Sequence, residues 1–363
     1  MKLPKLKVPF GIDWSLYLIP LILSIFGILI IFSITYTSDP TVVISQIIYL
    51  ILGFAVAIFL SFLDYRSLRG FSFFLYLAVL ALLVFVMFFG DKTMGASRWI
   101  DLGVFRLQPS EIGKFIILLF LAKTFTETDE FRFKEILTVL TIVGIPLIFI
   151  LRQPDFGTAM VIFVELLIIL FFSKVKKIYL AALLGLMLVF TPVGWHFLKD
   201  YQKERIYTFI NPAGDPYGSG YNVAQAKITV GSGGLLGQGI GKGTQIQLNF
   251  LPVAHTDFVF AATAEALGFI GSSAMILLLI YLSWRIIYIS KLSKDLFGFY
   301  FAIGWGLTLL FQIFINVGMN LGIMPVTGIP LPFVSAGGSS MLTNMAAIGV
   351  LQSIYLRHRK ISF

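Results

Sequence analysis

Asp257 is the residue in this chain whose type and position most clearly suggest chemistry, since it opens a long apolar segment right after His255-Thr256. A carboxylate entering hydrocarbon is costly and is usually kept for function. Such a group can accept a proton from a reacting molecule, and partial burial makes it a stronger base because burial disfavours its charged form. Asp257 is therefore the candidate catalytic residue. The simpler alternative is a helix cap formed together with Thr256.

Composition assigns the chain to the membrane proteins. Its 363 residues are 58% hydrophobic and only 12% charged, and the mean hydropathy is +0.93, whereas soluble domains carry about 25% charged residues. The absence of cysteine excludes disulfides and thiolate chemistry. With three histidines, at 196, 255 and 358, a histidine-based zinc site is not expected.

Hydropathy predicts a fold that is all-α and polytopic, because a membrane-spanning helix needs about 20 apolar residues. We expect one integral membrane domain over 1–363, with a large extracytoplasmic loop at 199–256 and a re-entrant or interfacial loop at 320–340. About ten transmembrane helices are predicted, near 15–36, 42–63, 72–90, 107–123, 135–151, 156–173, 178–198, 257–284, 296–319 and 340–356.

The basic residues predict the orientation. Most of the 27 Lys and Arg residues fall on the side of both termini when ten segments cross, and cytoplasmic loops are the ones enriched in Lys and Arg. Both termini are therefore predicted to be cytoplasmic. The net charge of +9 then reflects topology, and nucleic-acid binding is not expected.

The fourth segment begins with a polar half that contains Glu111 and Lys114. These residues are three apart and share a helical face, and a polar half-helix must face protein or a wet cavity. The pair is either a structural ion pair that joins helices or part of the wall of an outward-open cavity. Asp155 precedes the sixth segment, where it could cap the helix or belong to the same site.

Three outer regions carry further candidates. Arg98 and Trp99 could anchor the chain at the membrane interface or contact the pyrophosphate or sugar of a bound lipid. The glycine-rich stretch 231–243 could cradle a phosphate with Lys242 or be a loop without a ligand. Ser339 lies where the last helix opens, and N–H groups at that helix start could hold an anion.

Five motifs occur along the chain in the order Gln108-Pro109-Ser110-Glu111 with Lys114, Gln153-Pro154-Asp155-Phe156-Gly157, Gly243-Thr244-Gln245-Ile246-Gln247-Leu248-Asn249-Phe250-Leu251-Pro252, His255-Thr256-Asp257-Phe258, and Gly328-Ile329-Pro330-Leu331-Pro332-Phe333 with Gly337-Gly338-Ser339-Ser340. In this order they resemble the SEDS family (shape, elongation, division and sporulation), and within it the rod-shape elongation branch typified by RodA. Val253-Ala254 and Ala336 depart from the residues usual in the family.

The resemblance implies a peptidoglycan glycosyltransferase that polymerises lipid II at the outer face of the bacterial cytoplasmic membrane during elongation. It implies a class B penicillin-binding protein and other elongation-complex membrane proteins as partners. It also implies that Asp257 is essential and that Trp99, Glu111, Lys114 and Asp155 belong to the same outer cavity.

In that reaction Asp257 would take the proton of an acceptor hydroxyl, while His255 would orient the carboxylate, meet the sugar or simply pack at the interface. The leaving pyrophosphate needs positive charge, which Arg98, Lys114, Arg152 or Lys242 could supply. A divalent cation, Mg²⁺ or Mn²⁺, could assist, although no ligand set for it is evident in the sequence.

Two other functions fit a polar cavity among helices. A lipid II flippase would place its carboxylate near the membrane midplane with openings to both faces, whereas the polar groups here cluster on the predicted outer side. A scaffold that only recruits a penicillin-binding protein would not need Asp257.

Overall fold

The computed structural model describes residues 11–36, 39–93, 96–101, 103, 106–197, 200–211, 214 and 218–358. Parts of the predicted loop 199–256 thus lie outside the described residues. Every one of the ten predicted segments contains a helix. Six helices are long and apolar enough to cross a membrane, namely α1 (Ser15–Thr35), α2 (Thr41–Phe62), α3 (Tyr65–Phe89), α5 (Phe133–Arg152), α11 (Val259–Leu292) and α12 (Leu296–Leu321).

The remaining predicted segments form α4 (Pro109–Glu127), α6 (Phe156–Phe172), α7 (Lys177–Phe197) and α13 (Gly338–Leu356). Helix α4 begins at Pro109, where the fixed φ of proline suits the first turn. Its middle, 117–119, is completely buried. A helix that is apolar on all sides is typical of a bundle interior. The apolar half of α4 is shorter than a full membrane span.

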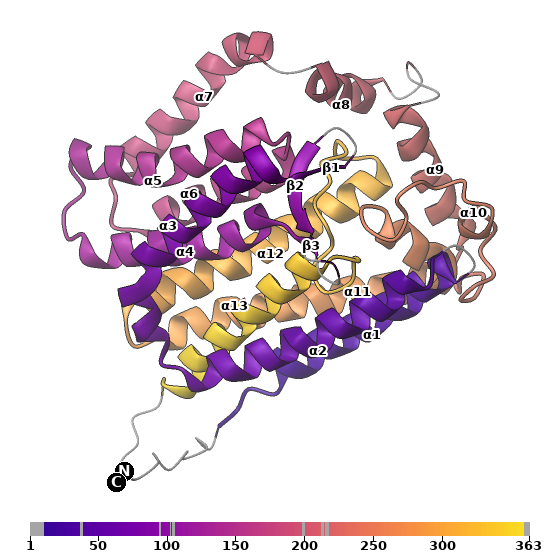
Figure 1. The fold of residues 1–363 in the computed structure, drawn as a ribbon, viewed down its shortest axis with the longest axis horizontal. Coiled ribbons are helices and arrows are strands. Elements are labelled where there is room, and N and C mark those ends of the chain that lie inside the picture. The colour runs from indigo at the N-terminus through magenta and orange to yellow at the C-terminus, as the bar shows by residue number, and fades with distance from the viewer. Residues whose placement is uncertain are drawn as a thin grey trace.

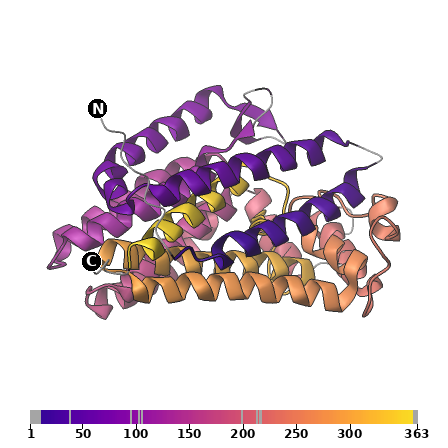
Figure 2. The ribbon, with the colours of Figure 1, turned by 90° about the horizontal axis from the view of Figure 1, so that it is seen from below.

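Helices α4, α12 and α13 form the centre of the bundle (Figure 1). Helix α12 packs on α11 at one side and on α4 and α6 at the other, while α13 packs on α2 and also touches α4. Figure 2 shows α11 and α12 side by side along the length of the molecule. The starts of α4, α6 and α11 and the end of α12 thereby meet at one end of the bundle.

A small antiparallel sheet is the one departure from the all-α prediction among the described residues. It consists of β1 (Asp91–Thr93), β2 (Ala96–Asp101) and β3 (Arg106–Leu107) in the order β1-β2-β3. Antiparallel strands need only short connections, so a segment too short and polar for a further span closes as a sheet between α3 and α4.

The predicted loop 199–256 contains α8 (Asp200–Ile210), α9 (Ser219–Ser232) and α10 (Thr244–Gln247). Its glycine-rich part is not a free loop, because it packs against a break in α11 at Gly268, whose φ is 67°. There the amides of residues 269 and 270 donate to carbonyls of residues 234 and 235 at 2.9 and 3.2 Å. A Cβ on Gly268 would lie 2.3 Å from the nitrogen of Gly237, so only glycine allows this approach.

The segment 322–337 connects α12 to α13 without regular structure, and its part 329–335 is mostly buried. It begins where α12 ends at Gly322, which has φ 69° and closes the helix in the left-handed conformation. Non-helical backbone is tolerated at membrane depth only when protein or a cavity surrounds it. This segment lies within the region 320–340, for which a re-entrant or interfacial loop stays a prediction.

Candidate active site

The main chain of Asp257 is anchored by two asparagines of α12. Asn316 and Asn320 each donate an amide hydrogen from Nδ2 to the carbonyl oxygen of Asp257, at 3.2 and 3.1 Å. The Oδ1 of Asn320 accepts from the amide of Ala261 at 3.0 Å. Both asparagines are completely buried and four residues apart on one helical face, so α12 fixes the start of α11.

The connecting segment 322–337 holds the same stretch from a second side. Ser335 donates from Oγ to the carbonyl oxygen of Thr256 at 2.6 Å, and the amide of Ala336 donates to the carbonyl oxygen of His255 at 2.9 Å. Gln46 of α2 in turn bonds the main chain at 335 and 337, at 3.3 and 3.1 Å. The acceptors at 255 and 256 are main-chain carbonyl oxygens, and Ala336 donates through its main-chain amide. The hydrogen bond of Ala336 therefore does not depend on the side chain at position 336.

The carboxyl of Asp257 is half-buried and caps no helix, since α11 starts at the N-cap Phe258 without a side-chain cap. The capping alternative is therefore not what the structure shows. A Cβ on Gly328 would lie 3.8 Å from Oδ2, so the connecting segment passes close to the carboxyl. Burial raises the pKa of Asp257, while the charge of Arg205, a hydrogen bond from Thr256 and the charge of Arg98 oppose that rise.

The charges of two arginines from different segments of the chain act on this carboxyl. Arg205 of α8 donates from Nη1 to the carbonyl oxygen of Thr327 at 3.2 Å. Arg98 of β2 donates from Nε to the carbonyl oxygen of Gln153 at 2.8 Å, and from Nη2 to that of Pro154. The small sheet thus positions one cation and α8 positions the other, with Asp257 within the electrostatic range of both.

Asp155 joins two helix starts. It caps α6 by accepting from the amide of Thr158 at 3.3 Å, and its Oδ2 accepts from Ser110 Oγ at 2.8 Å and Gln108 Nε2 at 3.0 Å. Ser339 extends this network, because its hydroxyl accepts from the amide of Gln108 at 2.8 Å. Asp155 is therefore a cap and also a link between α4 and α6.

The Glu111–Lys114 pair is closed within α4, with Nζ 2.8 Å from Oε2. The side chains are 6% and 1% exposed, so the pair does not lie open to solvent. Because both partners belong to one helix, it does not join two helices either. The structure thus shows a buried ion pair within one helix, and a place for it in a substrate cavity stays a prediction.

The remaining candidates are distributed around this centre. Trp99 lies half-buried on β2 beside Arg98. His255 is half-buried near Asp39, and burial lowers its pKa against the opposing charge of that aspartate. Lys242 is exposed on the glycine-rich segment, and no hydrogen bond or ion pair within the described part of the chain links it to Asp257.

The carboxylate of Glu265 lies against the end of the glycine-rich segment, where α10 begins. Glu265 of α11 accepts from the amides of Gln245 and Ile246 at 2.9 and 3.2 Å. A Cβ on Gly243 would lie 2.3 Å from Glu265 Oε2, which explains the glycine. Within the stretch 231–243 itself, the amides of Gln238 and Gly239 donate to the carbonyl oxygens of Glu265 and Ala266 at 2.9 and 3.0 Å, so these two amides are used in folding.

Sequence reasoning missed Arg205, Asn316, Asn320 and Gln46. The asparagine pair did carry a signal, since two amides four residues apart on an otherwise apolar helix are costly unless both are hydrogen-bonded. Arg205 carried none, because it sits in the charged stretch 200–205, where any of several cations could point inward.

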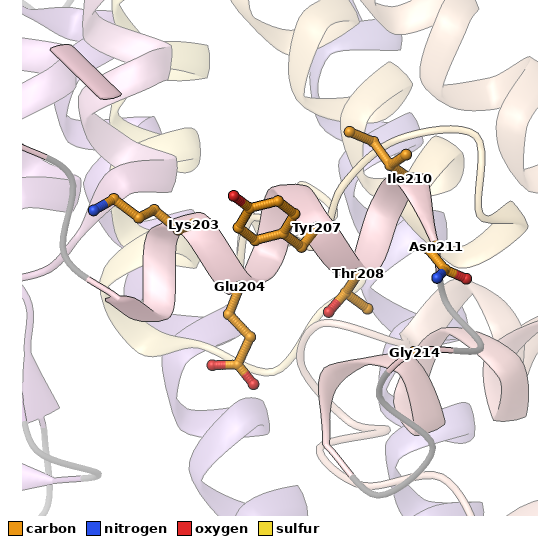
Figure 3. A pocket seen from close by; sticks show the side chains of 7 residues that line it. All are labelled: Lys203, Glu204, Tyr207, Thr208, Ile210, Asn211 and Gly214. Carbon is orange, nitrogen blue, oxygen red and sulfur yellow. The ribbon is translucent and has the colours of Figure 1, made fainter. Parts of the chain in front are cut away.

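Helix α8 also lines a hollow of about 520 Å³. Figure 3 shows Glu204 and Thr208 projecting from the same side of the helix, with Lys203 and Tyr207 elsewhere around the hollow. No group of three or more His, Cys, Asp or Glu side chains suited to a metal ion occurs in the described residues. In that part of the chain, arginine and lysine side chains are the evident positive groups near the outer end of the bundle.

Comparison with known proteins gives the same family along the whole chain. The sequence model of the cell cycle protein family of FtsW, RodA and SpoVE matches residues 12–360. The peptidoglycan glycosyltransferase MrdB of Escherichia coli K12 is 38% identical over 352 residues, which cover 96% of this chain and 94% of that protein. The probable peptidoglycan glycosyltransferase FtsW of Coxiella burnetii is 38% identical over 319 residues, which cover 86% and 85%.

Solved structures agree. A chain of a peptidoglycan synthase complex, described as coordinating polymerization and crosslinking, superposes with a TM-score of 0.84 at 30% identity and covers 96% of this chain and 99% of its own. The rod shape determining protein RodA of Thermus thermophilus superposes with a TM-score of 0.72 at 27% identity, covering 95% and 97%. The chain is an integral membrane protein of the FtsW, RodA and SpoVE family.

Proposed function

We propose that the chain is a peptidoglycan glycosyltransferase that polymerises lipid II into glycan strands during cell-wall elongation. The observation that carries the proposal is the arrangement at Asp257. Its main chain is bonded by Asn316 and Asn320, while its carboxyl is half-buried and within the electrostatic range of Arg98 and Arg205. The names of the relatives, MrdB and FtsW glycosyltransferases, support the same reaction.

In the proposed step Asp257 accepts the proton of the acceptor sugar hydroxyl as that oxygen attacks the anomeric carbon of the donor. The bond from the anomeric carbon to the pyrophosphate oxygen breaks, and the lipid pyrophosphate leaves with the electron pair. Burial favours a base that binds the proton well. Arg98 and Arg205 would stabilise the negative charge that develops on the leaving group.

The proposed orientation follows from the distribution of Lys and Arg. Ten helices cross the bacterial cytoplasmic membrane, both termini are cytoplasmic, and the end of the bundle with Asp257 faces outward. Lipid II would then enter at the level of its pyrophosphate. A class B penicillin-binding protein is the proposed partner, supported by the likeness to a complex that couples polymerization to crosslinking.

Purified protein with labelled lipid II in liposomes tests the proposal. We expect glycan strands that a muramidase digests, in the presence of the penicillin-binding protein with its transpeptidase blocked. Transfer of lipid II between leaflets without strand formation would instead assign a flippase, and neither activity would leave a scaffold.

A further inference from the structure

Helices α4, α6 and α12 meet in the bundle interior, where a second group of ionisable residues lies inward of Asp257. A Cβ on Gly304 of α12 would lie 2.6 Å from Leu118 of α4 and 3.3 Å from Ile169 of α6. One helical turn is 3.6 residues. Helix α12 runs opposite to α4 and α6, so one turn outward from this contact the three helices present Thr308, Lys114 and Glu165 at a common level.

Glu165 has no use in the proposed reaction and an unusual environment. It is 0% exposed, and neither carboxyl oxygen has a hydrogen-bond partner. The neighbouring face of α12 contributes further buried atoms without a partner, Thr308 Oγ1 and Gln312 Nε2. A buried carboxylate without a counter-ion or hydrogen bonds is among the most costly groups in a protein.

The charges around Glu165 do not balance. Lys114 and Glu111 of α4 are the charged groups that interact with it, and they already pair with each other at 2.8 Å. The adjoining face of α12 offers only uncharged groups. On the other two helices that pack on α6, the charged and titratable residues lie towards the helix ends: Lys134, Glu135 and Arg152 on α5, and Lys177, Tyr179 and His196 on α7. Three ionised groups here would carry a net charge of −1.

We propose that Glu165 carries a proton in the folded protein and acts through Lys114 as a positioning residue. A neutral Glu165 leaves the ammonium of Lys114 to Glu111 alone, which fixes the outer half of α4 and the Gln108–Ser110 corner that meets Asp155. An ionised Glu165 would compete for the same ammonium. The role in catalysis rests on the proposed function, but the protonation does not.

Infrared spectroscopy tests the protonation directly. The carbonyl-stretch band of a carboxylic acid should appear at neutral pH, shift on labelling with ¹³C-glutamate, and be missing from the Glu165→Gln variant. Glutamate labelling separates this band from any that Asp257 gives. Loss of carboxylate bands in the variant, with no acid band in the parent, would overturn the proposal.

Stability gives a second readout that needs no enzymatic activity. Glu165→Gln and Glu165→Leu, both uncharged, should unfold in detergent at midpoints close to the parent. A large drop in both, comparable to that of Lys114→Met, would mean that Lys114 needs the ionised carboxylate. A midpoint that rises with sodium concentration in the parent and not in the variants would assign the missing charge to a bound cation, which also contradicts a proton.

Turnover completes the test. Glu165→Gln, which mimics the protonated acid, should polymerise lipid II as the parent does at neutral pH. Inactivity of a folded Glu165→Gln variant would show that the ionised form is needed. If the parent itself makes no strands, the proposed function fails while the infrared result stands on its own.

Discussion

Two groups of ionisable side chains in this molecule hold their carboxylates in opposite ways. In the bundle interior, Lys114 occupies the carboxylate of Glu111 at 2.8 Å, and both side chains are buried. At the end of the bundle where α11 begins, Asn316 and Asn320 bond the carbonyl oxygen of Asp257 and not its carboxyl group. In the first arrangement the carboxylate itself forms the structural contact. In the second, the structural hydrogen bonds are made to the main chain of the acidic residue.

The difference explains which group can react. A catalytic base must be able to gain a proton and release it. Protonation of a carboxylate in a buried ion pair would leave the opposite charge buried and unpaired, which is strongly destabilising. Asp257 is fixed in position through its main chain, so its protonation leaves those hydrogen bonds in place. In the proposed function, Asp257 thereby combines a fixed main chain with a carboxyl that is not held in an ion pair within its own helix.

The largest expected effect is the loss of polymerisation when the carboxylate of Asp257 is removed. Asp257→Asn should lower lipid II polymerisation by roughly 10²–10⁴-fold, the usual contribution of a general base, because the amide cannot accept the proton. Strand formation by purified protein measures it. The variant should keep its thermal midpoint and still bind the penicillin-binding protein, since the carbonyl oxygen of Asp257 is unchanged. Strands of normal yield from Asp257→Asn would remove the catalytic role.

The interior pair should respond in stability. Lys114→Met leaves a buried carboxylate without its counter-ion, which typically costs about 3–5 kcal/mol, and the free energy of unfolding in detergent measures it. The control is Glu127→Gln, which breaks the Arg69–Glu127 pair whose side chains are 38% and 44% exposed. An exposed pair contributes only about 0–1 kcal/mol. Equal losses in the two variants would contradict the distinction between a buried and an exposed pair.

Asn320, which bonds the main chain at Asp257 and Ala261, should show an intermediate effect when it is replaced. Asn320→Leu removes the donor to Asp257 and the acceptor for Ala261, and a buried group left without its partner costs about 1–3 kcal/mol. Polymerisation should fall as the position of the carboxyl loosens. Asn344→Leu on α13 is the matched control, because Asn344 Nδ2 donates only locally, to Ser340. Full activity of Asn320→Leu would show that α12 does not position the base.

The helices could be predicted because hydropathy acts locally. Each of the ten apolar segments forms a helix, and even the polar start of the fourth, with Pro109, is helical. The sheet at 91–107 could not be predicted in this way, because its strands are two to six residues long. The break in α11 at Gly268 could not be predicted for another reason, because it depends on contact with the distant segment 234–237.

The site divides along the same line. The importance of Asp257 followed from one carboxylate beside an apolar run. The neighbours of that carboxylate did not, because Arg205 and Arg98 reach it from loops far apart in the sequence. Lys242 and Arg205 are both cations in the loop 199–256, and the sequence gives no reason to prefer one of them. In the structure, Lys242 is exposed on a segment bound to Glu265. Choosing between them required the tertiary structure.

The smallest expected effect concerns pH. Burial raises the pKa of Asp257 and the charge of Arg205 opposes that rise, so Arg205→Gln should raise the pKa further. Asp257 must be ionised to accept a proton, and activity is therefore lost as the pH falls through its pKa. The acid limb of the profile of turnover against pH should move to higher pH in Arg205→Gln.

Lys203→Gln supplies the control for this shift. Lys203 lies on the same helix and lines the hollow of Figure 3, and its charge is not among those that affect Asp257. Both variants lose one positive charge from α8, so a general electrostatic effect on the anionic substrate would lower turnover in each at every pH. A displaced acid limb in Arg205→Gln alone identifies a specific interaction with the base, whereas identical profiles would place Arg205 outside the reacting centre.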